Sequence, residues 1–183
     1  MKSILNSILV LLCLVSCKKI DENGYRTFKI KKGKHRSTFS YCTTKSNLIN
    51  FKVMFDESAE YYTSDPLNQY DVNKLYGVSD CGSRHMENSI RFGWRWLNDN
   101  LEILWFKHEE GIFSFDKITS IELNVPYDCS IELTDDSYIL RIGTEEKIID
   151  RKCSGKYKKY YLYPYFGGDE TAPHDINLRI KDI

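Results

Sequence analysis

The feature that most constrains the fold is a series of short segments in which apolar and polar residues alternate between turn residues. In the segment NFKVMFD, for example, Phe51, Val53 and Phe55 share one parity. Successive side chains of a β-strand point to opposite faces, so this period of two indicates strands with one buried face. No segment of ordinary helical length repeats its apolar residues at the 3.6-residue period. The pattern therefore predicts an all-β chain.

About ten such segments, rich in β-branched and aromatic residues, follow one another at short intervals. They cover residues 26–32, 50–56, 89–96, 101–108, 118–125, 129–135, 137–143, 146–152, 159–166 and 175–182. Many short strands joined by turns are typical of a β-sandwich or barrel. We expect a two-sheet antiparallel β-sandwich over residues 26–183, a jelly roll whose last strand returns beside an early one. The polar stretch 57–73 is expected to be a loop.

The N-terminus has the pattern of a secretory signal. A basic start precedes an apolar run that is too short to span a membrane and that ends in LVSC. This ending resembles the bacterial lipobox, in which the signal is cleaved before the cysteine and the sulfur is acylated. We therefore expect residues 1–16 to be a signal peptide, Cys17 to be lipidated and residues 17–25 to be a tether. Acyl chains on Cys17 would make the membrane a partner.

Two further stretches indicate where the protein resides. KKIDENG, directly after Cys17, resembles the export tag of surface lipoproteins in Bacteroidetes-type bacteria. LYPYFGGDETAPHDINLRI, residues 162–180, resembles a stretch of uncharacterised Bacteroidetes-type lipoproteins. We expect a lipid-anchored protein of the bacterial outer membrane that faces the cell exterior, with a periplasm-facing protein as the alternative. The 26 basic and 26 acidic residues balance, so no nucleic acid partner is expected.

Cys42, Cys81, Cys129 and Cys153 remain after the lipidated cysteine. Outside the cytoplasm an even set of cysteines indicates disulfides, and four cysteines allow three pairings. Loop length favours Cys42 with Cys81 and Cys129 with Cys153. A zinc site is not expected, because no closely spaced cysteine pair occurs.

The segment SIRFGWRW, residues 89–96, separates large apolar groups from two arginines. Its core face is expected to hold Ile90, Phe92, Trp94 and Trp96. Its other face holds Arg91 and Arg95, with Gly93 between them, which leaves the backbone open to a ligand. Arginine forks bind carboxylates and hydroxyl groups, so these two side chains are candidate ligand-binding residues.

The segment YYLYPYF is expected to bury Leu162 and Phe166 and to present Tyr161, Tyr163 and Tyr165 on the opposite face. If the sheets curve, these tyrosines and the two arginines line one concave surface. Tyrosine rings stack on the apolar faces of sugars. The alternative is that arginines and tyrosines pair across strands as ordinary surface residues. His85, in the loop before the arginine strand, is a further candidate for ligand contact, or is merely exposed.

Residues 71–111 resemble the jelly-roll polysaccharide lyases that act on alginate or glucuronan. The matching pieces are Lys74-Leu75-Tyr76-Gly77, Cys81-Gly82 and Ser89 to Arg95. The resemblance implies a concanavalin-like sandwich. It also implies that Arg91 or Arg95 would neutralise a uronate carboxylate. His85, His108 or a strand tyrosine would then remove the C5 proton. No strand carries the alternating acids of a retaining glycosidase.

A short acidic connection, GGDETAPHD, precedes the last segment. Asp169, Glu170 and Asp175 could hold calcium together with backbone carbonyls. The favoured alternative is a tight turn stabilised by local hydrogen bonds, because the spacing is not that of a calcium loop. We therefore expect no cofactor, with calcium as the alternative.

Three functions remain open at this point. The first is glycan binding on a concave arginine and tyrosine face. The second is a small polysaccharide lyase that uses the same face. The third is an envelope protein that binds another protein, of unknown identity, and no glycan. Neither the sugar nor the presence of catalysis follows from the sequence.

Overall fold

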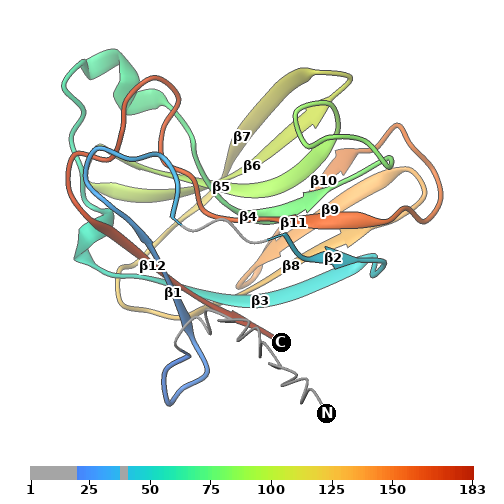
Figure 1. The fold of residues 1–183 in the computed structure, drawn as a ribbon, viewed down its shortest axis with the longest axis horizontal. Coiled ribbons are helices and arrows are strands. Elements are labelled where there is room, and N and C mark those ends of the chain that lie inside the picture. The colour runs from blue at the N-terminus through green and yellow to red at the C-terminus, as the bar shows by residue number, and fades with distance from the viewer. Residues whose placement is uncertain (1–19, 38–40) are drawn as a thin grey trace, which may run out of the picture.

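The computed structural model describes residues 20–37 and 41–183. The predicted signal peptide and the predicted lipidation site Cys17 lie outside these residues, so they remain predictions, as do the domain boundaries. Two antiparallel sheets of six strands pack face to face (Figure 1). None of the helices in this part of the chain has the length and apolar character of a membrane-spanning segment. The all-β sandwich predicted from the sequence is confirmed.

The first sheet has the strand order β1-β12-β3-β8-β9-β10. Its strands are β1 (Arg26–Ile30), β12 (Ile176–Asp182), β3 (Leu48–Phe55), β8 (Tyr127–Leu133), β9 (Ser137–Ile142) and β10 (Glu145–Asp150). β12 lies between β1 and β3, which confirms that the last strand returns beside an early one.

The second sheet has the order β2-β11-β4-β5-β6-β7. Its strands are β2 (Thr43–Thr44), β11 (Lys159–Leu162), β4 (Asn73–Ser79), β5 (Ser89–Leu97), β6 (Asn100–Glu109) and β7 (Ile112–Ile121). Two short 3₁₀ helices, η1 (Glu57–Ala59) and η2 (Pro66–Tyr70), interrupt the polar stretch that was predicted to be a loop.

Besides β2, which no predicted segment covers, and β11, which ends earlier than predicted, two strands of the second sheet depart from the sequence prediction. β4 was not among the predicted segments, because a bulge between Lys74 and Gly77 breaks its alternation. β7 begins at Ile112, earlier than the predicted start at Ile118. Its first half exposes large apolar side chains, so it lacks the buried face from which a strand is recognised. Both strands contribute to the site described below.

The core lies between the two sheets. Ile90, Phe92, Trp94 and Trp96 are all buried, as the alternation of β5 predicted. The Trp94 ring packs against Phe55 at 5.4 Å and Phe166 at 6.3 Å between centroids. Each large apolar side chain buried in this way contributes about 1.5–3 kcal/mol. This packing fixes β5, so that its other face is presented outward from a rigid support.

One disulfide joins Cys81 to Cys153, across 72 residues. The predicted pairings of Cys42 with Cys81 and of Cys129 with Cys153 are therefore wrong. Loop length was a poor guide, because the sandwich brings the β4–β5 loop next to the segment after β10. Cys129 is instead a buried thiol on β8.

Candidate functional site

The candidate site lies on the face of the second sheet that points away from the core. Figure 1 shows β5, β6 and β7 curving, and two cavities lie on this outer face. Backbone register places Gly77 of β4, Arg91 of β5, Phe106 of β6 and Phe115 of β7 side by side. Gly77 cannot carry a side chain here, because an added Cβ would lie 2.3 Å from the Cβ of Arg91. The bare backbone of β4 leaves room for the arginine.

Arg91 is the central residue of this face. It is only 7% exposed, and within the described part of the chain its side chain forms no ion pair or hydrogen bond. Its Nε is buried without an acceptor, and its guanidinium lies 5.7 Å from the centre of the Phe106 ring. Burial lowers the pKa of Arg91 to about 10. A buried charge without an anion is costly, so this geometry favours an anionic ligand.

Lys74 supplies a second positive charge to the same place. Its Nζ donates a hydrogen bond to the carbonyl of Gly167 at 3.1 Å and lies 4.8 Å from the centre of the Phe106 ring. Burial, together with the charge of Arg91, lowers the pKa of Lys74 to about 8. The two cations therefore repel each other, and an anion bound between them would relieve that repulsion.

Two histidines border the arginine. Burial and the charge of Arg91 lower the pKa of His108 to about 4 and also lower that of His85. His108 Nδ1 is buried without a partner. The backbone N–H of His85 donates to the Tyr160 hydroxyl at 2.7 Å, and its Nδ1 lies 3.0 Å from the same oxygen. The lowered pKa values favour the uncharged form of both imidazoles, which can accept a proton.

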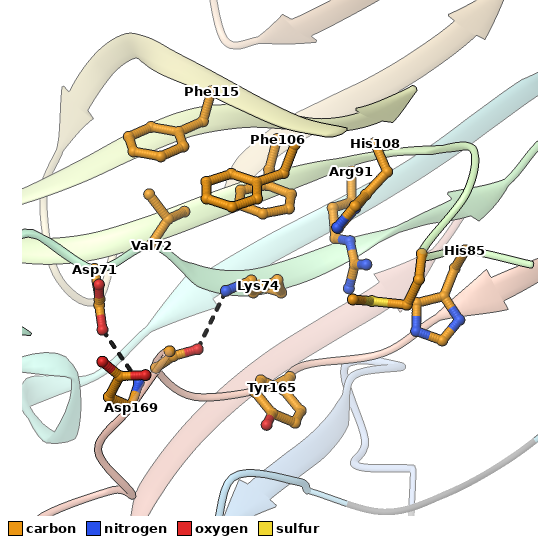
Figure 2. Close-up of a pocket in the computed structure, with 14 residues that line it drawn as sticks. Asp71, Val72, Lys74, His85, Arg91, Phe106, His108, Phe115, Tyr165 and Asp169 are labelled. Atoms are coloured by element: carbon orange, nitrogen blue, oxygen red, sulfur yellow. Dashed lines mark hydrogen bonds between the residues drawn. The ribbon is translucent and has the colours of Figure 1, made fainter. Parts of the chain in front are cut away.

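These side chains line a cavity of about 440 Å³, into which Arg91 and Lys74 project from neighbouring strands (Figure 2). Asp71 and Asp169 stand at the far end of the cavity, where the backbone N–H of Asp169 donates to Asp71 Oδ2 at 3.3 Å. A second cavity of about 440 Å³ continues past Arg91 toward β11. His85, Met86, Arg91 and Tyr165 line both cavities. We call the two cavities together the groove.

Three phenylalanines form an apolar platform at one side of the groove. The rings of Phe106, Phe113 and Phe115 are parallel within 6°, and their centroids lie 5.8–6.3 Å apart. Phe113 is 59% exposed and Phe115 is 39% exposed. Such a platform offers aromatic faces to the C–H faces of a sugar ring.

Arg95 does not join Arg91 in the groove. Its Nε donates to Glu102 at 2.7 Å, and its Nη1 donates to the carbonyl of Tyr70 at 2.9 Å. Glu102 also pairs with Lys117 at 2.8 Å. The prediction that Gly93 leaves an opening between the two arginines is also wrong, because an added Cβ on Gly93 would meet a side-chain carbon of Val72 at 2.4 Å.

The tyrosines of the YYLYPYF segment divide between the two faces. Tyr165 lines the groove, as predicted. Tyr161 and Tyr163 border the second cavity, but they pack against the core and contact Tyr76 at 5.7 and 5.8 Å between ring centroids. Leu162, predicted to face the core, pairs with Gly77 and so shares the outer face with Arg91. The prediction assumed that side chains alternate between the two faces through the whole segment. The strand ends at Leu162, so this alternation does not continue to Phe166, and the faces assigned to Leu162 and to the tyrosines on either side of it were wrong.

The three acids proposed as calcium ligands are held apart by separate partners. Glu170 accepts hydrogen bonds from the backbone of Ser64 and Asp65 at 2.8 Å. Asp175 pairs with Lys29 at 2.6 Å. Asp169 lies at the end of the groove. In residues 20–37 and 41–183 these acids form no metal-binding group. The local hydrogen bonds expected in the alternative are not observed either, because the partners of Glu170 and Asp175 lie on segments far away in the sequence.

Among the groove residues that sequence reasoning did not find are Lys74, Phe113 and Phe115, besides Phe106 and Asp71. Lys74 was noted only as part of a matching motif, because β4 was not recognised as a strand. Phe113 and Phe115 lie in the half of β7 that was left unassigned. The missed signal was the alternation of Phe113 and Phe115 with polar residues, directly after the Glu-Glu-Gly turn.

The strand order and the hollowed outer face define a concanavalin-like jelly-roll sandwich. No protein-family model matches the chain, and no curated protein sequence matches it. Among solved structures, the alginate lyase AlyC3 is similar, with a TM-score of 0.61 at 12% identity, over 90% of this chain and 76% of that chain. The same lyase in complex with dimannuronate gives a TM-score of 0.58 at 11% identity, over 90% and 75%.

A second similar structure is SCLam, a non-specific endo-β-1,3(4)-glucanase of family GH16. Its TM-score is 0.56 at 10% identity, over 87% of this chain and 70% of that chain. At these identities the likeness establishes the fold and leaves the activity to be argued from the site.

Proposed function

We propose that the groove binds an acidic glycan and that Arg91 holds a sugar carboxylate. The observation that carries this proposal is a buried guanidinium with no anionic partner among the described residues, at the wall of an open cavity. An arginine fork fits a carboxylate with two parallel hydrogen bonds, and such charge-assisted bonds are the strong ones. Lys74, on the adjacent strand, adds a second charge to the same anion or to its neighbour.

The other groove residues fit the rest of a sugar. The phenylalanine platform offers apolar faces to sugar C–H groups, and Asp71 and Asp169 offer acceptors to hydroxyl groups. The likeness in fold to an alginate lyase, solved with dimannuronate bound, agrees with this ligand class. A neutral glycan would leave Arg91 without an anion, so acidic polymers are the favoured ligands.

Native gels cast with alginate, polygalacturonate or a neutral β-glucan test the proposal. The Arg91→Ala variant is compared with Arg95→Ala, a matched control that removes the same residue type from the same face of β5. We expect an acidic polymer to retard the wild type and the control but not Arg91→Ala. If no polymer retards the wild type, glycan binding is wrong, and the chain is better regarded as a protein-interaction module.

We also propose β-elimination as a second candidate function, because His85 and His108 line the same cavity as Arg91 and their lowered pKa values favour the uncharged form. In this reaction a base takes the C5 proton, the C4–O bond breaks as a C4=C5 double bond forms, and the leaving oxygen gains a proton. His108 or the His85–Tyr160 pair would supply the base, while Arg91 neutralises the carboxylate. Ultraviolet absorbance of unsaturated products, followed after mixing with the polymer that is bound, separates a lyase from a binding protein.

We further propose that Cys17 anchors the protein to the outer membrane and that the sandwich faces the cell exterior. The motif LVSC and the following KKIDENG support this location. Membrane fractionation of cells carrying Cys17→Ala tests the anchor, since the variant should leave the membrane fraction. Protease treatment of intact cells tests the surface position, and a protein that resists cleavage would place the domain in the periplasm.

A further inference from the structure

A second basic surface lies on the loop after β1. Figure 1 shows this loop beside the connection that leads from β11 to β12. The backbone N–H of Phe166 donates to the carbonyl of His35 at 2.7 Å, and that of Ala172 donates to the carbonyl of Lys34 at 3.1 Å, so the loop is fixed in place. A cavity of about 560 Å³ lies against it. Its lining consists of Lys29, Lys31, Lys34, His35, Arg36, Ser37 and Tyr165.

Most of the positive charges on this loop have no ion-pair partner in the part of the chain that the structure describes, although Asp175 is close enough to interact with Lys29 and Lys31. Lys29 pairs with Asp175 at 2.6 Å. Lys31, Lys34 and Arg36 are exposed and take part in no ion pair within the described residues. The whole chain has no net charge, so this concentration of cations is a local feature. Such a patch attracts anions over a distance that depends on salt.

The basic loop is continuous with the groove. Tyr165 lines both groove cavities and the cavity of the loop, and Arg36 lines the loop cavity and the second groove cavity. The His35 ring stacks on the Tyr165 ring at 5.1 Å with an interplanar angle of 9°. His35 Nδ1 also lies 2.9 Å from the carbonyl oxygen of Phe166. A fixed aromatic pair therefore joins the two positive surfaces.

We infer that the ligand is a polyanionic glycan with acidic groups on consecutive sugars, and that it extends from Arg91 over Tyr165 onto Lys31 and Lys34. This inference rests on the proposed function and specifies its ligand. A mostly neutral polymer with isolated acids would use Arg91 but would gain nothing from the loop. Each exposed lysine adds little to a single contact, but several charges along one polyanion add together.

Calorimetry with oligomannuronates and oligogalacturonates of increasing length tests the inference. The purified protein is compared with Lys31→Ala/Lys34→Ala and with Lys45→Ala/Lys147→Ala, a control that removes two exposed lysines outside the three cavities. We expect the affinity of the wild type to rise from the disaccharide to the hexasaccharide. The loop variant should match the wild type on the disaccharide and bind the hexasaccharide about five- to tenfold more weakly.

The outcomes separate the inference from the proposed function. A loop variant that matches the control at every length overturns the inference, while loss of binding in Arg91→Ala would still support the groove. Failure of the wild type to bind any acidic oligosaccharide overturns the proposed function and the inference with it. Vesicles containing phosphatidylglycerol form a further arm. Binding of these vesicles that depends on Lys31 and Lys34, without an effect of the two residues on the hexasaccharide, would assign the loop to a membrane instead.

Discussion

The outer face of β5 carries an arginine in each of its two halves, Arg91 and Arg95, and the two side chains have different environments. Arg95 lies opposite Glu102 on β6, and the two form an ion pair of 2.7 Å. Arg91 lies opposite Phe106, and within the described residues it has no anionic partner. Arg95 is therefore part of the scaffold, whereas Arg91 is available to a ligand. The residue on the neighbouring strand decides which role an arginine takes.

A third arginine supports this interpretation. Arg151 is as buried as Arg91, but Asp80 satisfies it with bonds of 2.7 and 3.1 Å, and Tyr138 donates to the same carboxylate at 2.9 Å. The fold thus supplies a carboxylate where a buried arginine is structural. Of these three arginines, only Arg91 has no carboxylate partner among the described residues, and it is therefore the one expected to bind a ligand anion.

Loss of the disulfide should have the largest effect, and it should act on the Arg91 half. The Cys81→Ser/Cys153→Ser variant opens a loop closed across 72 residues. A loop of this length corresponds to about 4 kcal/mol in the free energy of unfolding. Urea unfolding measures this loss, and a reductant should reproduce it in the wild type but not in the variant.

Affinity for the acidic ligand should also fall, because the β4–β5 loop carries His85 to the groove. A variant as stable as the wild type would contradict the prediction.

The Phe106→Glu substitution should convert the Arg91 half into a copy of the Arg95 half. The new carboxylate would face Arg91 across the strand pair and occupy the position of the ligand anion. We expect affinity for an oligomannuronate, measured by calorimetry, to fall about a hundredfold. Phe106→Leu, which keeps an apolar side chain, is the control. Unchanged affinity in Phe106→Glu would mean that Arg91 does not contact the anion.

Substitutions in the Arg95 half and in the Arg91 half of this face should have different effects on the free energy of unfolding. Glu102→Gln leaves Arg95 and Lys117 without their carboxylate, so the free energy of unfolding should fall by about 1–2 kcal/mol. Arg91→Met removes a buried charge that has no partner in the described structure, so stability should stay the same or rise. Urea unfolding of both variants decides the matter. A clear loss of stability in Arg91→Met would show that Arg91 has a structural role.

The smallest effect should be a dependence of affinity on pH that arises from Lys74. Its pKa is lowered to about 8, so the free protein loses this charge as the pH rises through that value. The bound anion favours the protonated amine, so affinity should be constant below pH 8 and fall about fivefold above it. Lys74→Met should bind more weakly with a flatter profile. An equal decline in wild type and variant would assign the titration to another group.

The sequence predicted the faces of β5 well because its alternation is uninterrupted. Four large apolar residues on one parity leave no other strand register with a buried face. The outer position of Arg91 follows from the same pattern. The difference between Arg91 and Arg95 does not, because it depends on which β6 residue pairs with each one. That pairing is set by the turn at Asn98 and Asp99, both at positive φ.

The wrong predictions concern features that the alternation of apolar and polar residues does not reveal. The bulge in β4 concealed a strand, and with it Lys74. The end of the ladder at Leu162 reversed the faces assigned to Tyr161 and Tyr163. The disulfide joins residues that only the completed sandwich brings together. In each case the deciding contact is between segments far apart in the chain.

The position of β12 between β1 and β3 determines when the first sheet can form in full. Among the described strands of the first sheet, β1 pairs with β12 alone, and β3 has β12 as one of two neighbours. β12 (Ile176–Asp182) joins these two strands although both lie far earlier in the chain, as the pairs Arg26 with Ile180 and Phe55 with Leu178 show. Pairing over such separations is slow to form, so the first sheet stays in two parts until β12 is in place. Docking of β12 is therefore expected to be a late step in the folding of the sandwich.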